Sequence, residues 1–198
     1  MPFVRRTSSA VVAVLAAVTL AACGAVSDDA DADAVSGDAG DSEFSLGPKV
    51  DMTFELDGAT TLKGKQTALA PSLNGKFLKS CDEYSQGTKQ DDGKTLFAIA
   101  GLLDGNVDGR KVTVELWIDD YTGPGTYPKD QLVAPGSRPS IAIDNKVYGT
   151  WPESTSSEVT TDGDGGGTWT FRKLATTGEG GLPGDPVDGT LKWTCSNP

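Results

Sequence analysis

Hydrophobic and polar residues alternate one by one along several short stretches of this chain, a period of two that is typical of half-buried β-strands. In the clearest stretch, Val112, Val114, Leu116 and Ile118 share one face and polar residues or Trp117 occupy the other. The strand candidates besides this one are residues 50–56, 77–81, 141–148, 158–161, 168–174 and 189–195. Because these stretches are short, turn residues separate them and no long period of 3.6 is present, the pattern predicts an all-β domain, an antiparallel β-sandwich or barrel.

Four other regions are less uniform. Residues 95–103 are almost continuously apolar and fit either a buried strand or a short helix, with Gly101 favouring the strand. Residues 144–146 predict a bulge or turn within the candidate strand 141–148, and the glycine-rich residues 162–167 predict the tip of a hairpin. The polar residues 82–94 predict a loop.

The amino-terminal segment predicts where the protein is located. Arg5 and Arg6 precede an apolar run over residues 11–22, which is typical of a secretory signal peptide and too short to span a bilayer as a helix. The run ends in Leu20-Ala21-Ala22-Cys23, a bacterial lipobox pattern. It predicts cleavage before Cys23 and attachment of a diacylglycerol, so that fatty acyl chains such as palmitate anchor the protein. The alternative is an ordinary signal peptide in which Cys23 stands at that place by chance.

Three regions follow from this pattern: a signal peptide (1–22), a lipidated Cys and disordered acidic linker (23–47), and an extracytoplasmic β domain (48–198). The predicted location is the extracellular face of the cytoplasmic membrane. The chain of 198 residues carries a net charge of −11, which becomes −13 once Arg5 and Arg6 are removed with the signal peptide. Such an acidic chain lacks the basic face that nucleic-acid binding requires, so no nucleic-acid partner is expected.

Cysteine and histidine usage limits the chemistry further. With Cys23 taken by lipid, Cys81 and Cys195 remain as an even pair in an oxidising compartment, which predicts a disulfide bond between them. The alternative is two free buried thiols. The chain contains no histidine, which excludes Ser-His-Asp and Cys-His catalysis and the usual catalytic zinc sites. Asp119 and Asp120 are neighbours on a predicted strand and point to opposite faces, so we expect no catalytic carboxylate pair there and no enzyme.

One segment matches the calcium-binding loop of EF-hands. Asp104, Asn106 and Asp108, followed by Gly109 and then Glu115, fit the pattern D-x-[DN]-x-[DN]-G-x5-E. These side chains would supply several hard oxygen ligands within a short segment. However, Glu115 lies in a predicted strand instead of a helix, so the other reading is a hairpin turn rich in Asp, Asn and Gly. Calcium is the only cofactor that the sequence suggests.

Trp117 offers a second binding hypothesis. It falls on the polar side of its predicted strand, and an exposed Trp on a sheet face is how many carbohydrate-binding modules stack on sugar rings. The alternative is that a second layer or a loop covers Trp117. Trp193 shares the face of Cys195 and is expected in the core.

Several features resemble actinobacterial surface lipoproteins of the mycobacterial lipoprotein-antigen family. They are the lipobox at Cys23, the acidic linker of small residues, Gly47-Pro48-Lys49-Val50 at the domain start, and Thr194-Cys195-Ser196 after the last strand. The resemblance covers the two ends and the two-cysteine layout, and it implies a cell-envelope lipoprotein without enzymatic activity. We therefore expect a membrane-anchored protein with a binding or surface-structural role, and as the alternative an extracellular glycan- or calcium-binding module. Its partners would be the membrane, through the lipid, and a cell-wall glycan or a protein.

Overall fold

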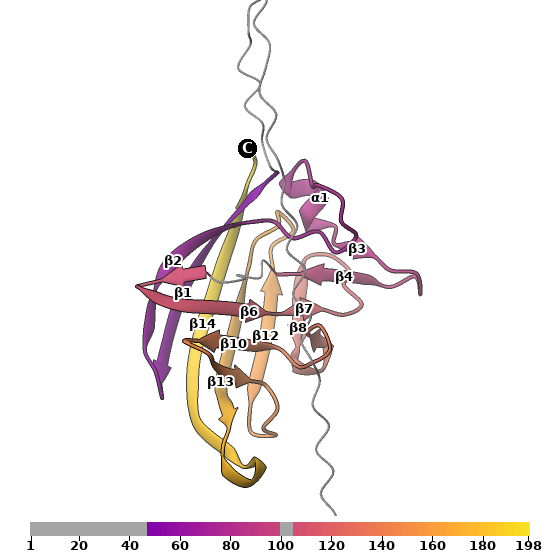
Figure 1. The fold of residues 1–198 in the computed structure, drawn as a ribbon. Coiled ribbons are helices and arrows are strands. Elements are labelled where there is room, and N and C mark those ends of the chain that lie inside the picture. Colours follow the sequence, from indigo (N-terminus) through magenta and orange to yellow (C-terminus); the bar gives the residue numbers. More distant parts are fainter. Residues whose placement is uncertain (1–46, 100–104) are drawn as a thin grey trace, which may run out of the picture. The chain divides into compact units, whose positions relative to one another are not determined.

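Strand β1 (Lys49–Gly58) lies between two long partners in a computed structural model of the chain (Figure 1). The structure describes residues 47–99 and 105–198, which belong to one unit of the chain. Along its whole length β1 pairs antiparallel with β14 (Pro183–Ser196), and it pairs on its other side with β2 (Leu62–Leu69). The domain is all-β, as predicted, with a nearly closed antiparallel, barrel-like sheet and a second, smaller sheet.

The large sheet has the strand order β2-β1-β14-β13-β11-β10-β6-β5. Its other strands are β13 (Gly167–Thr177), β11 (Lys146–Gly149), β10 (Ser140–Ile143), β6 (Arg110–Glu115) and β5 (Gly105–Val107). A branch leaves it through β12 (Ser156–Thr161), which pairs with β13 and with β8 (Gly125–Pro128). The smaller sheet contains β3 (Thr88–Lys89), β4 (Thr95–Ala98), β7 (Trp117–Ile118) and β9 (Leu132–Val133). Short helices are α1 (Cys81–Ser85) and the 3-10 turns η1 (Lys129–Gln131) and η2 (Glu179–Gly181).

The two outermost strands of the large sheet, β2 and β5, pack closely against each other. A methyl group added at Gly64 of β2 would lie 2.8 Å from Cγ1 of Val107 in β5. Because glycine has no Cβ, it allows this close approach of the two strands. The contact brings the ends of the sheet together and makes it barrel-like.

The core contains the inward-facing residues of both sheets. On β1, the predicted alternation is confirmed, because Val50, Met52, Phe54 and Leu56 are buried while the residues between them are exposed or half-buried. Trp193 is also buried, as expected. The largest fully buried side chains are Trp169, Trp193, Phe54, Phe97, Phe171, Met52, Leu62, Ile99, Leu116, Ile118, Ile141 and Ile143.

The predicted strand at residues 77–81 is wrong, because Cys81 begins the short helix α1. Ser80 caps this helix with its Oγ, which accepts a hydrogen bond from the Glu83 N–H at 3.2 Å. The Glu83 carboxylate in turn accepts from the Lys79 N–H at 2.7 Å, four residues back. These reciprocal side-chain bonds satisfy backbone donors at the helix start and favour a helical turn over an extended chain.

Three further segments refine the sequence interpretation. Residues 95–98 form strand β4, whereas 100–104 lie outside the described residues. The predicted strand 112–118 is divided at Leu116, so that β6 belongs to the large sheet and β7 to the smaller one. The predicted strand 141–148 is a hairpin of β10 and β11. Its turn residues Asp144 and Asn145 have φ of 48° and 70°, a left-handed conformation that Asp and Asn tolerate.

The chain enters the large sheet at one of its two ends. The chain enters it at Pro48, and we call this the entry end, where Lys49 pairs with Ser196. At the opposite end, which we call the far end, Gly58 pairs with Val187 and the Ala59 N–H donates to the Pro186 carbonyl at 2.9 Å. Helix α1 lies at the entry end.

Cys81 and Cys195 are at disulfide distance, with 2.06 Å between their sulfurs. The predicted pairing of these cysteines therefore agrees with the structure. The Cys81 N–H also donates to Oδ1 of Asn197 at 2.7 Å, which adds a second link between α1 and the end of the last strand. Together, the bond and the hydrogen bond fix α1 to the entry end of the sheet.

Candidate functional site

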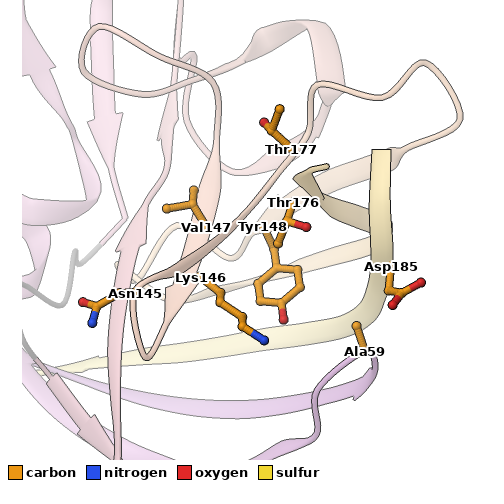
Figure 2. Close-up of a pocket in the computed structure, with 8 residues that line it drawn as sticks. All are labelled: Ala59, Asn145, Lys146, Val147, Tyr148, Thr176, Thr177 and Asp185. Carbon is orange, nitrogen blue, oxygen red and sulfur yellow. The ribbon is translucent and has the colours of Figure 1, made fainter. Parts of the chain in front are cut away.

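A polar groove of about 510 Å³ opens at the far end of the large sheet (Figure 2). It lies among the β1–β2 connection, the β10–β11 hairpin, the end of β13 and the start of β14. Its lining residues are Ala59, Asn145, Lys146, Val147, Tyr148, Thr176, Thr177 and Asp185. The groove therefore combines side chains from segments that are far apart in the sequence.

Arg110 holds the hairpin that forms one wall of this groove. Its Nε donates to Oδ2 of Asp144 at 2.7 Å, and the Lys111 N–H donates to Oδ1 of Asp144 at 3.1 Å. The guanidinium also donates to the Thr61 carbonyl at 3.2 Å and to the Thr60 hydroxyl. The hydrogen bond from Arg110 to the Asp144 carboxylate lowers the pKa of Asp144 below its ordinary value, because the bond and the positive charge of the guanidinium favour the ionised form. One arginine thus connects the β10–β11 turn to the β1–β2 connection.

Tyr148 is the most deeply placed residue of the groove. Its side chain is only 3% exposed, and Figure 2 shows the ring extending among the other lining side chains. Its hydroxyl has no hydrogen-bond partner within residues 47–99 and 105–198. Among the described residues, the fully buried side-chain nitrogen or oxygen that lacks a partner is Nε1 of Trp193. The Tyr148 hydroxyl is therefore not sealed in the core but faces the groove, where a ligand or water can reach it.

The groove offers mixed hydrogen-bonding chemistry. Lys146 supplies an ammonium group and Asp185 a carboxylate, so the two formal charges at the rim balance each other. Thr176, Thr177 and Tyr148 add hydroxyl groups, each of which can donate and accept. An aromatic ring beside neutral hydroxyl groups and one charge of each sign suits an uncharged ligand with many hydroxyls better than a strongly charged one.

The predicted calcium ligands occupy a tight hairpin. Asn106 lies in β5 opposite Lys111, and Asp108 forms the two-residue turn with Gly109 at φ of 52° and 74°. Glu115 lies at the end of β6, opposite Ser140. Asp104 lies outside the described residues. In the described part of the chain, no three His, Cys, Asp or Glu side chains gather as a metal-binding group, so calcium binding stays a prediction without structural support.

Trp117 is half-buried in β7, where it pairs with Ala98 of β4 and Val133 of β9. Strand β7 is one of the two central strands of the smaller sheet, and Trp117 is not among the residues that line the groove. Its stacking on a sugar remains a prediction.

The acidic neighbours Asp119 and Asp120 follow β7. Nζ of Lys94 donates to Oδ2 of Asp119 at 3.1 Å, and this contact raises the pKa of the Lys94 ammonium. Asp120 has a φ of 53° in the turn that follows. Asp119 is therefore engaged with a lysine.

Sequence reasoning did not identify the groove. The turn at residues 144–146 was visible, but nothing in the local pattern indicated that Tyr148 would meet Thr176 and Asp185. Tyr148 follows two exposed residues on β11, and its position in the sequence is typical of a side chain that points into the core.

Two further findings bear on the function. Cys23 lies outside the described residues, and within these residues no helix is long and apolar enough to cross a membrane. No family model, curated protein or solved structure matches this chain. The lipobox, the two-cysteine layout and the groove are the features of this chain that bear on its function.

Proposed function

We propose that this protein is a cell-envelope lipoprotein, anchored through Cys23 to the outer face of the cytoplasmic membrane, with a non-enzymatic binding role at the far-end groove. The observation that carries the binding role is the Tyr148 hydroxyl, which faces the groove without a partner in the described chain. A polar group in such a place is stabilised by a hydrogen bond from a ligand or water. The anchoring role is supported by the match of Leu20-Ala21-Ala22-Cys23 to a lipobox.

The layout of the domain is compatible with this role. The 24 residues from Gly24 to Gly47 can span at most about 80 Å when fully extended. The groove lies at the other end of the ten-residue strand β1, which corresponds to about 30 Å from the entry end. An anchor at Cys23 would therefore join the domain at the end that lies opposite the groove, and leave the groove accessible to the envelope.

A glycan is the ligand class that this groove favours. Sugar rings present several hydroxyl groups, which match the hydroxyls of Thr176, Thr177 and Tyr148. One Lys and one Asp at the rim can each hold a sugar hydroxyl without selecting a net charge. The sequence predicts a glycan at Trp117 as the alternative, and substitutions at the two places allow them to be compared directly.

The anchor is tested by expressing the full chain in a bacterium that processes lipoproteins. We expect mature protein in the membrane fraction, with a mass increase of a diacylglycerol on Cys23. The variant Cys23→Ala should leave the membrane fraction and lose the lipid mass. A parent chain that is recovered without lipid would overturn the anchoring role.

The binding role is tested with purified cell-wall glycan fragments and the variant Tyr148→Phe. Because the hydroxyl has no partner in the described chain, we expect an unchanged melting temperature. Its loss should weaken glycan binding by about 2- to 10-fold, the value of one neutral hydrogen bond. Trp117→Phe is the control and should bind like the parent. Equal affinities of the parent and Tyr148→Phe would refute the groove, and a loss confined to Trp117→Phe would place the site on the smaller sheet.

A further inference from the structure

A large hydrophobic side chain projects into solvent at the entry end of the domain. Phe77 is 79% exposed, and Leu69 at the end of β2 is 45% exposed. Both line a hollow of about 240 Å³ together with Pro48, Ala70 and Leu78. Exposed apolar surface is unfavourable in water, and the exposed phenyl ring lies beside a second exposed apolar side chain.

The chain enters the domain at this same patch. Pro48 is part of the hollow, and a methyl group added at Gly47 would lie 2.7 Å from the Leu78 carbonyl oxygen. The segment that leads back to Cys23 therefore leaves the domain beside Phe77. Whatever holds Cys23 lies within about 80 Å of the patch, because the 24 residues from Gly24 to Gly47 can span no more than that.

Charges around the patch differ from those of the chain as a whole. Lys49, Lys76 and Lys79 are exposed at the entry end, and none of them forms an ion pair with another described residue. Asp51 of β1 and Asp82 and Glu83 of α1 are the acidic residues closest to these lysines along the described chain. The Asp51 carboxylate accepts a hydrogen bond from the Thr67 hydroxyl, and Glu83 accepts one from the Lys79 N–H. A lysine next to an exposed phenylalanine is the combination that settles at a phospholipid headgroup boundary.

We propose that the entry end rests on the bilayer surface, with Phe77 inserted at the boundary between headgroups and acyl chains. This inference rests on the proposed anchoring of Cys23. One phenylalanine alone binds a membrane weakly, but the anchor keeps the domain at a high local concentration near the lipid, which makes a weak contact sufficient. The bilayer is favoured over a second copy of the chain because two apolar residues fall far short of the roughly 800 Å² per partner of a stable interface.

The contact would orient the domain. Without it, the anchor at Cys23 alone would not determine which face of the domain approaches the membrane. With Phe77 inserted, β1 and β14 lead away from the bilayer and the groove beside Tyr148 points outward. The patch would thus act as a positioning surface for the binding site at the other end.

The contact is tested by placing a tryptophan at the patch and measuring its quenching by brominated lipids. Phe77→Trp is compared with Leu182→Trp in the lipidated full chain, reconstituted into vesicles of phosphatidylglycerol and phosphatidylethanolamine. Leu182 is the matched control, because it is 69% exposed and lies next to the start of β14, at the opposite end. The unchanged chain gives the background from its four native tryptophans.

We expect brominated lipids to quench most of the emission added at residue 77 and to shift it to shorter wavelength, and to leave that added at residue 182 unchanged. Protein that floats with the vesicles but shows no quenching at either position would overturn the contact while leaving the anchor intact. Equal quenching at both positions would also overturn it, because the domain would have no preferred end. Protein that does not float would refute the anchor itself and, with it, this inference.

Discussion

The bond between Cys81 and Cys195 gives the sharpest stability prediction. It joins α1 to the last strand across a sequence separation of 114 residues, so the closed loop contains most of the domain. The double variant Cys81→Ala with Cys195→Ala removes this link and leaves the native contacts nearby, including the Cys81 N–H bond to Asn197 and the Tyr84 hydroxyl bond to the Ala98 carbonyl at 3.0 Å. The change therefore acts mainly on the unfolded chain.

The magnitude follows from the length of the loop. The chain-entropy model gives about 5 kcal/mol for a loop of this size at 25 °C, and removal of native disulfides typically costs 2–5 kcal/mol. We expect a loss of about 4 kcal/mol in the free energy of unfolding. Small domains have total stabilities of only about 5–15 kcal/mol, so the double variant should be folded but much less stable.

Urea unfolding monitored by tryptophan fluorescence measures this loss. With a slope of about 2 kcal/mol per molar urea, the transition midpoint should fall by about 2 M. The parent chain in excess dithiothreitol should follow the curve of the double variant, and dithiothreitol should leave the double variant unchanged. If the double variant unfolded at the same urea concentration as the oxidised parent, the loop-closure reasoning would be refuted for this chain.

Two further changes test the packing and the electrostatics. Gly167→Ala should lower the free energy of unfolding by about 3 kcal/mol, because the new methyl would lie 2.5 Å from Cζ2 of Trp193 and closer still to a backbone carbonyl. Thermal melts measure this loss, and Gly125→Ala is the control, because its new methyl would make only ordinary van der Waals contacts. If both melted alike, the close approach would carry no energetic weight. For Asp144, the folded pKa is lowered by Arg110, so its stabilising contribution is present above the ordinary pKa near 3.8 and is lost as the pH falls through the lower folded value. The stability difference between the parent and Asp144→Asn should therefore shrink as the pH falls from above the ordinary pKa to below the lowered folded one, and a constant difference would contradict this assignment.

The strands of this domain could be predicted from the sequence more fully than their connections. The alternation of Val50, Met52, Phe54 and Leu56 determines which face of β1 is buried, because side chains on a strand alternate. The same period continues through Leu116, so it could not show that β6 and β7 belong to different sheets. For α1, the Ser80 and Glu83 spacing was a local signal that the strand prediction overlooked.

The candidate site was less predictable for a physical reason. A groove depends on which segments the tertiary fold brings together, and Ala59, Tyr148, Thr176 and Asp185 are separated by many residues. No local pattern encodes that meeting. The calcium candidate and the sugar candidate were both local patterns. Among the described residues, no three His, Cys, Asp or Glu side chains gather as a metal-binding group, and Trp117 does not line the groove.

The pairing of the first strand with the last affects how the domain reaches its native state. Lys49 of β1 pairs with Ser196 of β14, so the longest ladder needs both ends of the domain. Closing so long a loop before contacts form is slow, which gives a late step in folding. A chain that is exported from its amino end, as the lipobox predicts, presents β1 long before β14. For a chain exported in this way, the β1–β14 ladder would be completed only after Cys195 has emerged.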